Sequence, residues 1–203
     1  MKLWRGLFLT MSSFVLITTS LVQVPAAPMN SFSGSEDAVI DVSPIKNPVI
    51  IRVNFSGESV FTVTPIDSTG KKQLSLFLAI GDHKGVHYQK AYTKPIVAYE
   101  IAGTGEWNME IAPISDARVV PTKSVAGNGD DVVRFTKPSS GFKRISFTHD
   151  GEGVFSVTPL DSKGRSRFPL MLKIGAYTGT VVLPSGTQYL DISADGNWTF
   201  SIK

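Results

Sequence analysis

The chain has 203 residues, no cysteine and a formal net charge of +3, from 20 Lys and Arg against 17 Asp and Glu. Without cysteine it has no disulfide framework, no thiol nucleophile and no lipid-bearing cysteine, so a hydrophobic core must supply the stability. The small charge excess argues against a nucleic-acid partner, because 18 basic and 17 acidic residues remain once the basic start described next is removed.

Residues 1–26 have the pattern of a secretory signal peptide. Lys2 and Arg5 precede an apolar run over 7–24, and small residues ending in Ala26 form a cleavage site. We expect cleavage after Ala26, which makes the protein secreted, in the extracellular space or at the cell surface. The alternative is an uncleaved membrane anchor, although the run is shorter than the roughly 20 residues of a spanning helix and contains several Ser and Thr.

The remainder of the chain contains the same segment twice. Residues 36–85 align with residues 130–179 without a gap, and 19 of the 50 aligned positions are identical. Beyond this block the second copy is three residues shorter, and Trp107 then aligns with Trp198. Two copies of about 80 residues predict tandem domains and not a solenoid, in which many repeats share one continuous core.

We place the first domain at 33–114, a linker at 115–126 and the second domain at 127–203. In each domain apolar and polar residues alternate with period 2, as in GESVFTVTPIDSTG at 57–70, and Asp and Gly frame the turns. About seven short strands per copy, with turn signals every ~8–12 residues, are typical of a sandwich. The fold class is therefore all-β: two tandem antiparallel β-sandwich domains, jelly-roll-like in arrangement, after the signal peptide.

The alternation also predicts which side of a strand faces the core. In the first copy Phe61 and Val63 are expected to point inward and the intervening Thr residues outward. In the second copy the same reasoning places Phe168, Leu170, Leu172 and Ile174 on the core side.

The second copy also shows motifs of a known group of proteins. A Gly-rich start with Asp and Val at 127–133, a Phe-x-Val strand leading to Leu-Asp-x-x-Gly at 155–164, and a closing Asp-Gly-Asn-Trp at 195–198 form the pattern. This pattern resembles uncharacterised secreted β-sandwich modules of Gram-positive bacteria, chiefly actinobacteria. The architecture is similar to bacterial pre-peptidase C-terminal jelly-roll domains. The resemblance implies a secreted bacterial protein, and it implies no functional residue.

The sequence carries no mark of catalysis. His83, His87 and His149 are the only histidines, and none recurs in the other copy. The chain has no nucleophile elbow, zinc-protease motif or phosphate-binding loop. We therefore expect a protein that is not an enzyme.

One local cluster has the residue types of a metal site. Asp82, His83 and His87 combine a carboxylate with two imidazoles, which suits a transition metal. The alternative is a polar loop next to a hairpin, since three ligands without a fourth are common.

Calcium is a second possible metal. We expect no cofactor, with Ca²⁺ as the alternative. Glu36 and Asp37 in the first copy align with Asp130 and Asp131 in the second, and carboxylate oxygens in a loop suit Ca²⁺. A calcium site needs six or more oxygens, so the alternative is an exposed, charged strand start.

Aromatic residues divide into a core set and a surface set. Trp107 and Trp198 precede residues at core spacing, which favours burial over sugar stacking. Tyr88, Tyr92 and Tyr177 are the expected exposed aromatic residues of a ligand surface.

Lys163, Arg165 and Arg167 make the hairpins of the second copy basic. Such residues are able to bind an anionic wall polymer, and the alternative is an ordinary solvated surface.

These observations predict a non-enzymatic, secreted binding or structural protein that recognises a cell-wall polymer or another glycan. Shared core positions with divergent loops motivate this prediction, because recognition varies in loops on a rigid scaffold. The alternatives are an accessory or inhibitory module that binds another secreted protein and, third, a hydrolase with an unrecognised site.

Overall fold

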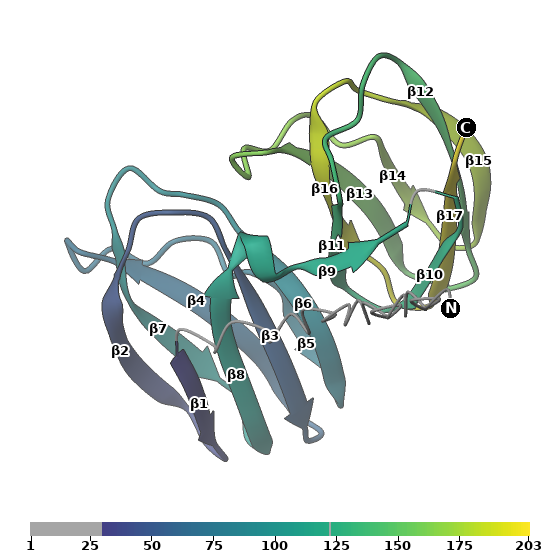
Figure 1. Ribbon diagram of the computed structural model, residues 1–203. Coiled ribbons are helices and arrows are strands. Elements are labelled where there is room, and N and C mark those ends of the chain that lie inside the picture. The colour runs from purple at the N-terminus through teal and green to yellow at the C-terminus, as the bar shows by residue number, and fades with distance from the viewer. Residues whose placement is uncertain (1–29, 122) are drawn as a thin grey trace, which may run out of the picture.

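The computed structural model describes residues 30–121 and 123–203, which form two β-sandwiches (Figure 1). We call them the N-terminal sandwich (strands β1 to β8) and the C-terminal sandwich (strands β9 to β17). The expected signal peptide at 1–26, with its alternative of a membrane anchor, lies outside the described residues. Within the described part of the chain, no helix has the length and apolar character needed to cross a membrane.

The N-terminal sandwich has two four-stranded sheets, ordered β1-β8-β3-β6 and β2-β7-β4-β5. All strand pairs in both sheets are antiparallel. This order is that of a jelly roll: sequential strands alternate between the two sheets, except that β4 and β5 pair within one sheet. The strands are β1 Asn30–Gly34, β2 Ala38–Ile45, β3 Val49–Ser56, β4 Val60–Asp67, β5 Leu78–Ile80, β6 His83–Gln89, β7 Ile96–Ala102 and β8 Glu106–Pro113.

The C-terminal sandwich repeats this order in the sheets β10-β17-β12-β15 and β14-β13-β16-β11-β9. The jelly-roll expectation is therefore confirmed in both copies. The strands are β9 Arg118–Val120, β10 Val125–Asn128, β11 Asp131–Phe135, β12 Lys143–His149, β13 Val154–Asp161, β14 Met171–Ile174, β15 Tyr177–Leu183, β16 Thr187–Ser193 and β17 Asn197–Ile202.

The segment expected to be a linker is largely structured. A short 3₁₀ helix, η1 (Ile114–Asp116), follows β8, and β9 then pairs in parallel with β11. Strand β9 covers the outer side of β11, whereas β2, the equivalent of β11 in the N-terminal sandwich, forms the open edge of its sheet. The N-terminal sandwich also begins before the expected residue 33, because β1 starts at Asn30 and pairs with β8.

Each sandwich closes over a tryptophan. Trp107 and Trp198 are 2% and 1% exposed, and their indole N–H groups donate to the backbone oxygens of Glu36 and Gly129, at 2.9 Å in both cases. Each ring lies against a glycine of the neighbouring strand, where a Cβ atom would collide with the ring. The core prediction for both tryptophans is confirmed.

The alternation rule holds on β4 and fails near β14. Phe61 and Val63 are fully buried, as expected. Leu170 also packs against the core, but Phe168, Leu172 and Ile174 are 93%, 67% and 83% exposed. Strand register explains the failure, because the core residue Val157 lies opposite Met171, so Met171 points inward and its neighbour outward.

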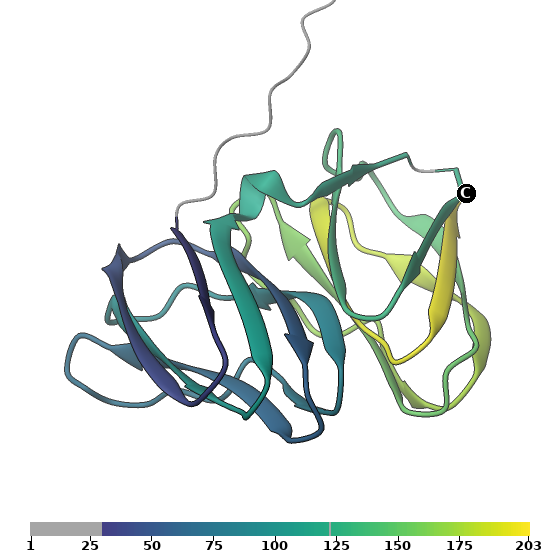
Figure 2. The same cartoon turned by 90° about the horizontal axis from the view of Figure 1, so that it is seen from below.

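The two sandwiches lie side by side (Figure 2). Between them is a separate apolar cluster, to which both contribute. Tyr88 and Val86 of β6 pack against it. Its buried members are Ile50, Ala112, Ile114, Ala117, Val132, Leu160 and Tyr189.

Candidate functional site

Strand connections in a jelly roll fall at two opposite ends, and in this protein the two ends differ in charge. In the N-terminal sandwich the connections β2–β3, β4–β5 and β6–β7 lie at one end, which we call the basic end. The equivalent connections of the C-terminal sandwich are β11–β12, β13–β14 and β15–β16. These six connections contain nine Lys and Arg and no Asp or Glu. The nine are Lys46, Lys71, Lys72, Lys90, Lys94, Lys137, Lys163, Arg165 and Arg167.

The connections at the opposite end, the acidic end, have the reverse composition. They contain eight Asp and Glu and no Lys or Arg. The eight are Glu36, Asp37, Glu58, Asp82, Asp130, Asp150, Glu152 and Asp195. Each sandwich is therefore polarised along its strands, although its net charge is small.

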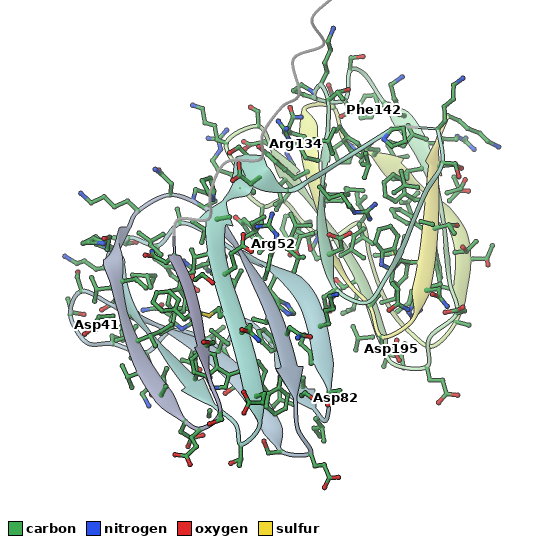
Figure 3. All side chains as sticks on the ribbon, turned by 60° about the horizontal axis from the view of Figure 1, so that its bottom comes forward. Asp41, Arg52, Asp82, Arg134, Phe142 and Asp195 are labelled. Carbon is green, nitrogen blue, oxygen red and sulfur yellow. The ribbon has the colours of Figure 1, made fainter. Side chains whose placement is uncertain are left out.

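The basic ends of the two sandwiches lie next to each other. Gly164, in the β13–β14 connection, lies against Pro48 of the β2–β3 connection, where an added Cβ would come within 3.0 Å of the proline ring. At the other end, the backbone N–H of Val86 donates to the Asp130 carbonyl oxygen, at 3.0 Å. Figure 3 shows Asp82 and Asp195 at one end of the molecule and Phe142 at the other. The whole chain therefore has one basic end and one acidic end.

Most cations of the basic end are not neutralised within the protein. Lys72 pairs with Glu100, and Arg165 pairs with Asp161. In the part of the chain that the structure describes, the other seven form no salt bridge. Lys163, Arg165 and Arg167, selected from the sequence, all lie here with exposed side chains.

Two aromatic rings accompany these charges in the C-terminal sandwich. Phe142 and Phe168 are 89% and 93% exposed. The two connections that carry them are both bonded to the β15–β16 connection. The Ser139 hydroxyl donates to the Pro184 oxygen at 2.7 Å, and Arg167 donates to the Ser185 oxygen at 3.1 Å. The basic end therefore offers exposed rings and cations on braced loops.

Of the three tyrosines expected at a ligand surface, Tyr88 and Tyr92 line one hollow together with Lys90, and Tyr177 lies on β15 of the other sandwich. Tyr88 contacts the cluster between the sandwiches, and its hydroxyl donates to the Gly164 carbonyl oxygen. Tyr92 packs against the N-terminal core and Tyr177 against the C-terminal core. Burial raises the pKa of the Tyr88 and Tyr92 hydroxyls. That these tyrosines contact a ligand stays a prediction.

The expected metal ligands divide between two places. His83 and His87 lie together, with Nε2 atoms 3.0 Å apart, but the third group near them is Asp130 of the C-terminal sandwich. Asp82 instead accepts from the Ser56 hydroxyl at 3.1 Å and from the Gly57 N–H at 3.0 Å. Sequence reasoning missed this partnership of His83, His87 and Asp130 because it joins residues 43 or more positions apart.

The four residues considered for calcium do not converge. Asp37 accepts from the Gly103 N–H at 2.7 Å, and Asp131 pairs with Arg118 at 2.6 Å. Glu36 is exposed on the loop of the first copy. Among the described residues, the histidine–aspartate group is the one place where three or more such side chains approach a common point.

A groove of about 550 Å³ runs between the sandwiches. Its arginines are already engaged: Arg52 contacts Glu110 at 2.6 Å and the Asp116 oxygen at 2.8 Å, and Arg118 contacts Asp131. These contacts stabilise the junction.

Comparisons with known proteins do not assign a family. Neither models of protein families nor curated proteins match the chain. Among solved structures it is similar to the PBSX exported protein XepA, with 6% identity over 87% of this chain and 82% of that one, and a TM-score of 0.27. It is also similar to cAMP-bound PfPKA-R (7% identity, 85% and 70% covered, TM-score 0.22). A regulatory subunit of a cAMP-independent protein kinase A from Trypanosoma brucei matches with 9% identity, 85% and 73% covered, and a TM-score of 0.24. These values are too low to indicate a function.

Proposed function

We propose that the protein is a non-enzymatic binding protein of the cell surface or extracellular space, and that its basic end binds an anionic glycan or wall polymer. The observation that carries this proposal is the composition of the six connections at that end, with nine cations and no carboxylate. The extracellular setting comes from the signal-peptide pattern of residues 1–26.

A polymer fits this arrangement better than a small anion does. Each exposed cation contributes little by itself, on the order of 1 kcal/mol or less, because water and salt screen it. Two adjacent basic ends on one chain engage successive charges of a repeating polymer, so the weak contacts act together. Phe142 and Phe168 supply apolar faces against which sugar rings stack.

The ligand class is tested with two polymers that differ only in charge. Polygalacturonate carries one carboxylate per sugar, and its methyl ester carries none. We expect the chain to bind the acid form, to lose affinity as salt rises and to ignore the ester. Equal binding to both forms, or to neither polygalacturonate nor poly(glycerol phosphate), contradicts the proposal.

The position of the site is tested with two charge-matched double variants. Lys137→Glu with Lys163→Glu reverses two exposed cations of the basic end. Lys84→Glu with Lys173→Glu makes the same change in net charge on exposed positions of β6 and β14. The first variant should lose affinity about tenfold or more, and the second should stay within about twofold of the unmodified protein.

The two alternatives give different results in the same assays. An accessory or inhibitory module captures one secreted protein and no glycan. A hydrolase releases soluble fragments from a polymer, which a reducing-end assay detects.

A further inference from the structure

Three side chains from the two sandwiches meet at the acidic end. His83 and His87 come from β6, and Asp130 precedes β11. One ligand atom from each residue lies within 4.8 Å of the other two. The carboxylate Oδ2 of Asp130 is 3.9 Å from Nε2 of His83 and 3.7 Å from Nδ1 of His87.

Strand geometry places the two imidazoles on one side of β6. His83 lies opposite Phe55 and His87 opposite Ile51, and both partners belong to the N-terminal core. Phe77 stacks on both rings, with centroids 4.9 and 3.9 Å away. The rings are therefore held in a fixed orientation before any ion arrives.

Gly85, between the two histidines, leaves the space in which the three groups meet. A Cβ atom there would lie 3.0 Å from Asp130 Cβ, 3.1 Å from His87 Nε2 and 3.2 Å from His83 Nε2. In the C-terminal sandwich the equivalent glycine, Gly179, lies under the hydroxyl of Tyr177, which fills this space. The second copy of the repeat therefore lacks the space that the three side chains share next to Gly85.

Asp130 is held by the fold through one oxygen, and its other oxygen is the one nearest the two histidines. Its Oδ1 accepts from the Ala194 N–H at 2.9 Å. Asp37, which like Asp130 directly precedes its strand, accepts in the same way from the Gly103 N–H in the N-terminal sandwich. Only at Asp130 do histidines from the other sandwich face the second oxygen.

We propose that His83, His87 and Asp130 bind one divalent transition-metal ion of the Zn²⁺ type, and that this ion joins the two sandwiches. Two imidazoles and one carboxylate are ligands that Zn²⁺ accepts at bond lengths of about 2.0–2.2 Å. Ligand atoms of a tetrahedral zinc site lie about 3.3 Å apart. One atom from each of the three groups lies within 4.8 Å of the other two, so side-chain shifts of up to about 1.5 Å bring them to that spacing. A fourth position remains for water.

The inference is tested by isothermal titration of the full chain with Zn²⁺. We expect one ion per chain, and we expect Asp130→Asn to weaken binding about tenfold or more, because it removes the charged ligand and keeps a capping oxygen. Asp82→Asn is the matched control. It makes the same change beside His83, at a residue whose carboxylate faces Ser56 and Gly57, and should bind Zn²⁺ as the unmodified protein does.

A second measurement covers variants whose folding suffers. Co²⁺ in an imidazole–carboxylate site gives visible absorption bands, which His83→Gln should abolish while its far-UV circular dichroism stays unchanged. His149→Phe installs the residue found at the equivalent position, Phe55, and should keep the bands. No heat with Zn²⁺ at millimolar concentration overturns the inference, and so does loss of binding in Asp82→Asn with retention in Asp130→Asn.

This site is independent of the proposed polymer-binding function. It lies at the acidic end, whereas the polymer is expected at the basic end. Loss of Zn²⁺ binding in Asp130→Asn should therefore leave polymer affinity unchanged, and the two proposals succeed or fail separately.

Discussion

The hydroxyl of Tyr88 donates a hydrogen bond to the carbonyl oxygen of Gly164 and so connects β6 of one sandwich to the β13–β14 connection of the other. The same connection in the N-terminal sandwich contains Gly70, which has no heavy atom within 4 Å of an added Cβ. The repeat therefore uses one turn in two ways, as a free loop in the first copy and as a docking element in the second.

Alanine at these two glycines separates turn strain from docking. Both have positive φ, 80° for Gly70 and 70° for Gly164, so each Gly→Ala change costs about 1–2 kcal/mol of strain. At Gly164 the new Cβ also lies 3.0 Å from Pro48 and Ile114 atoms, which adds about 1–3 kcal/mol. Urea unfolding should show the larger loss in Gly164→Ala. Equal losses would show that the turn does not support the junction.

Asp191, on the face of β16 toward the junction, gives the stability a specific pH dependence. Burial raises the pKa of its carboxyl to about 7, and the charge of Asp130 acts in the same direction. Between about pH 4 and pH 7 the unfolded chain releases a proton that the folded chain keeps, so this residue makes stability fall as pH rises. His87, whose pKa burial lowers to about 3, acts in the opposite direction.

The contribution of Asp191 is isolated by comparison with Asp191→Asn, which is neutral at every pH. In buffer with EDTA, the variant should match the unmodified protein near pH 4 and exceed it in unfolding free energy near pH 8. Asp41→Asn, on an exposed position of β2, is the control and should show no such pH-dependent difference. A constant difference across the pH range for Asp191→Asn contradicts this assignment.

The apolar cluster at the junction predicts that the sandwiches unfold together. Once residues 1–26 are removed, Trp107 and Trp198 are the only tryptophans. Trp107→Phe leaves a reporter in the C-terminal sandwich, and Trp198→Phe leaves one in the N-terminal sandwich. Each change should cost about 1–3 kcal/mol from lost packing and one lost hydrogen bond.

Coupled unfolding makes the urea midpoint from fluorescence agree with that from circular dichroism within each variant. Separate transitions would show that the junction is too weak to couple the sandwiches.

The fold was largely predictable because duplication repeats the pattern of core residues and turns. Phe61, Val63 and both tryptophans are buried as the period-2 alternation indicates. The inner side of β14 was not predictable, because it depends on the register of Met171 against Val157. Strand β9 was missed, since three residues without alternation resemble a linker.

The sites depend on connectivity that periodicity does not contain. The charge difference between the ends becomes visible only when each loop is assigned to an end of the jelly roll, which needs the strand order. The pairing of His83 and His87 with Asp130 depends on how the sandwiches pack. His83 and His87 were nevertheless recognisable, because two histidines four residues apart on a strand share one side.

The most direct test of the proposed function is hydrogen exchange of the whole chain with and without polygalacturonate at low salt. We expect slower amide exchange in the connections 68–77, 90–95, 136–142 and 162–170, and no change in the connections of the acidic end. Protection confined to the acidic end or to the sheet faces, or no protection at saturating polymer, would contradict it.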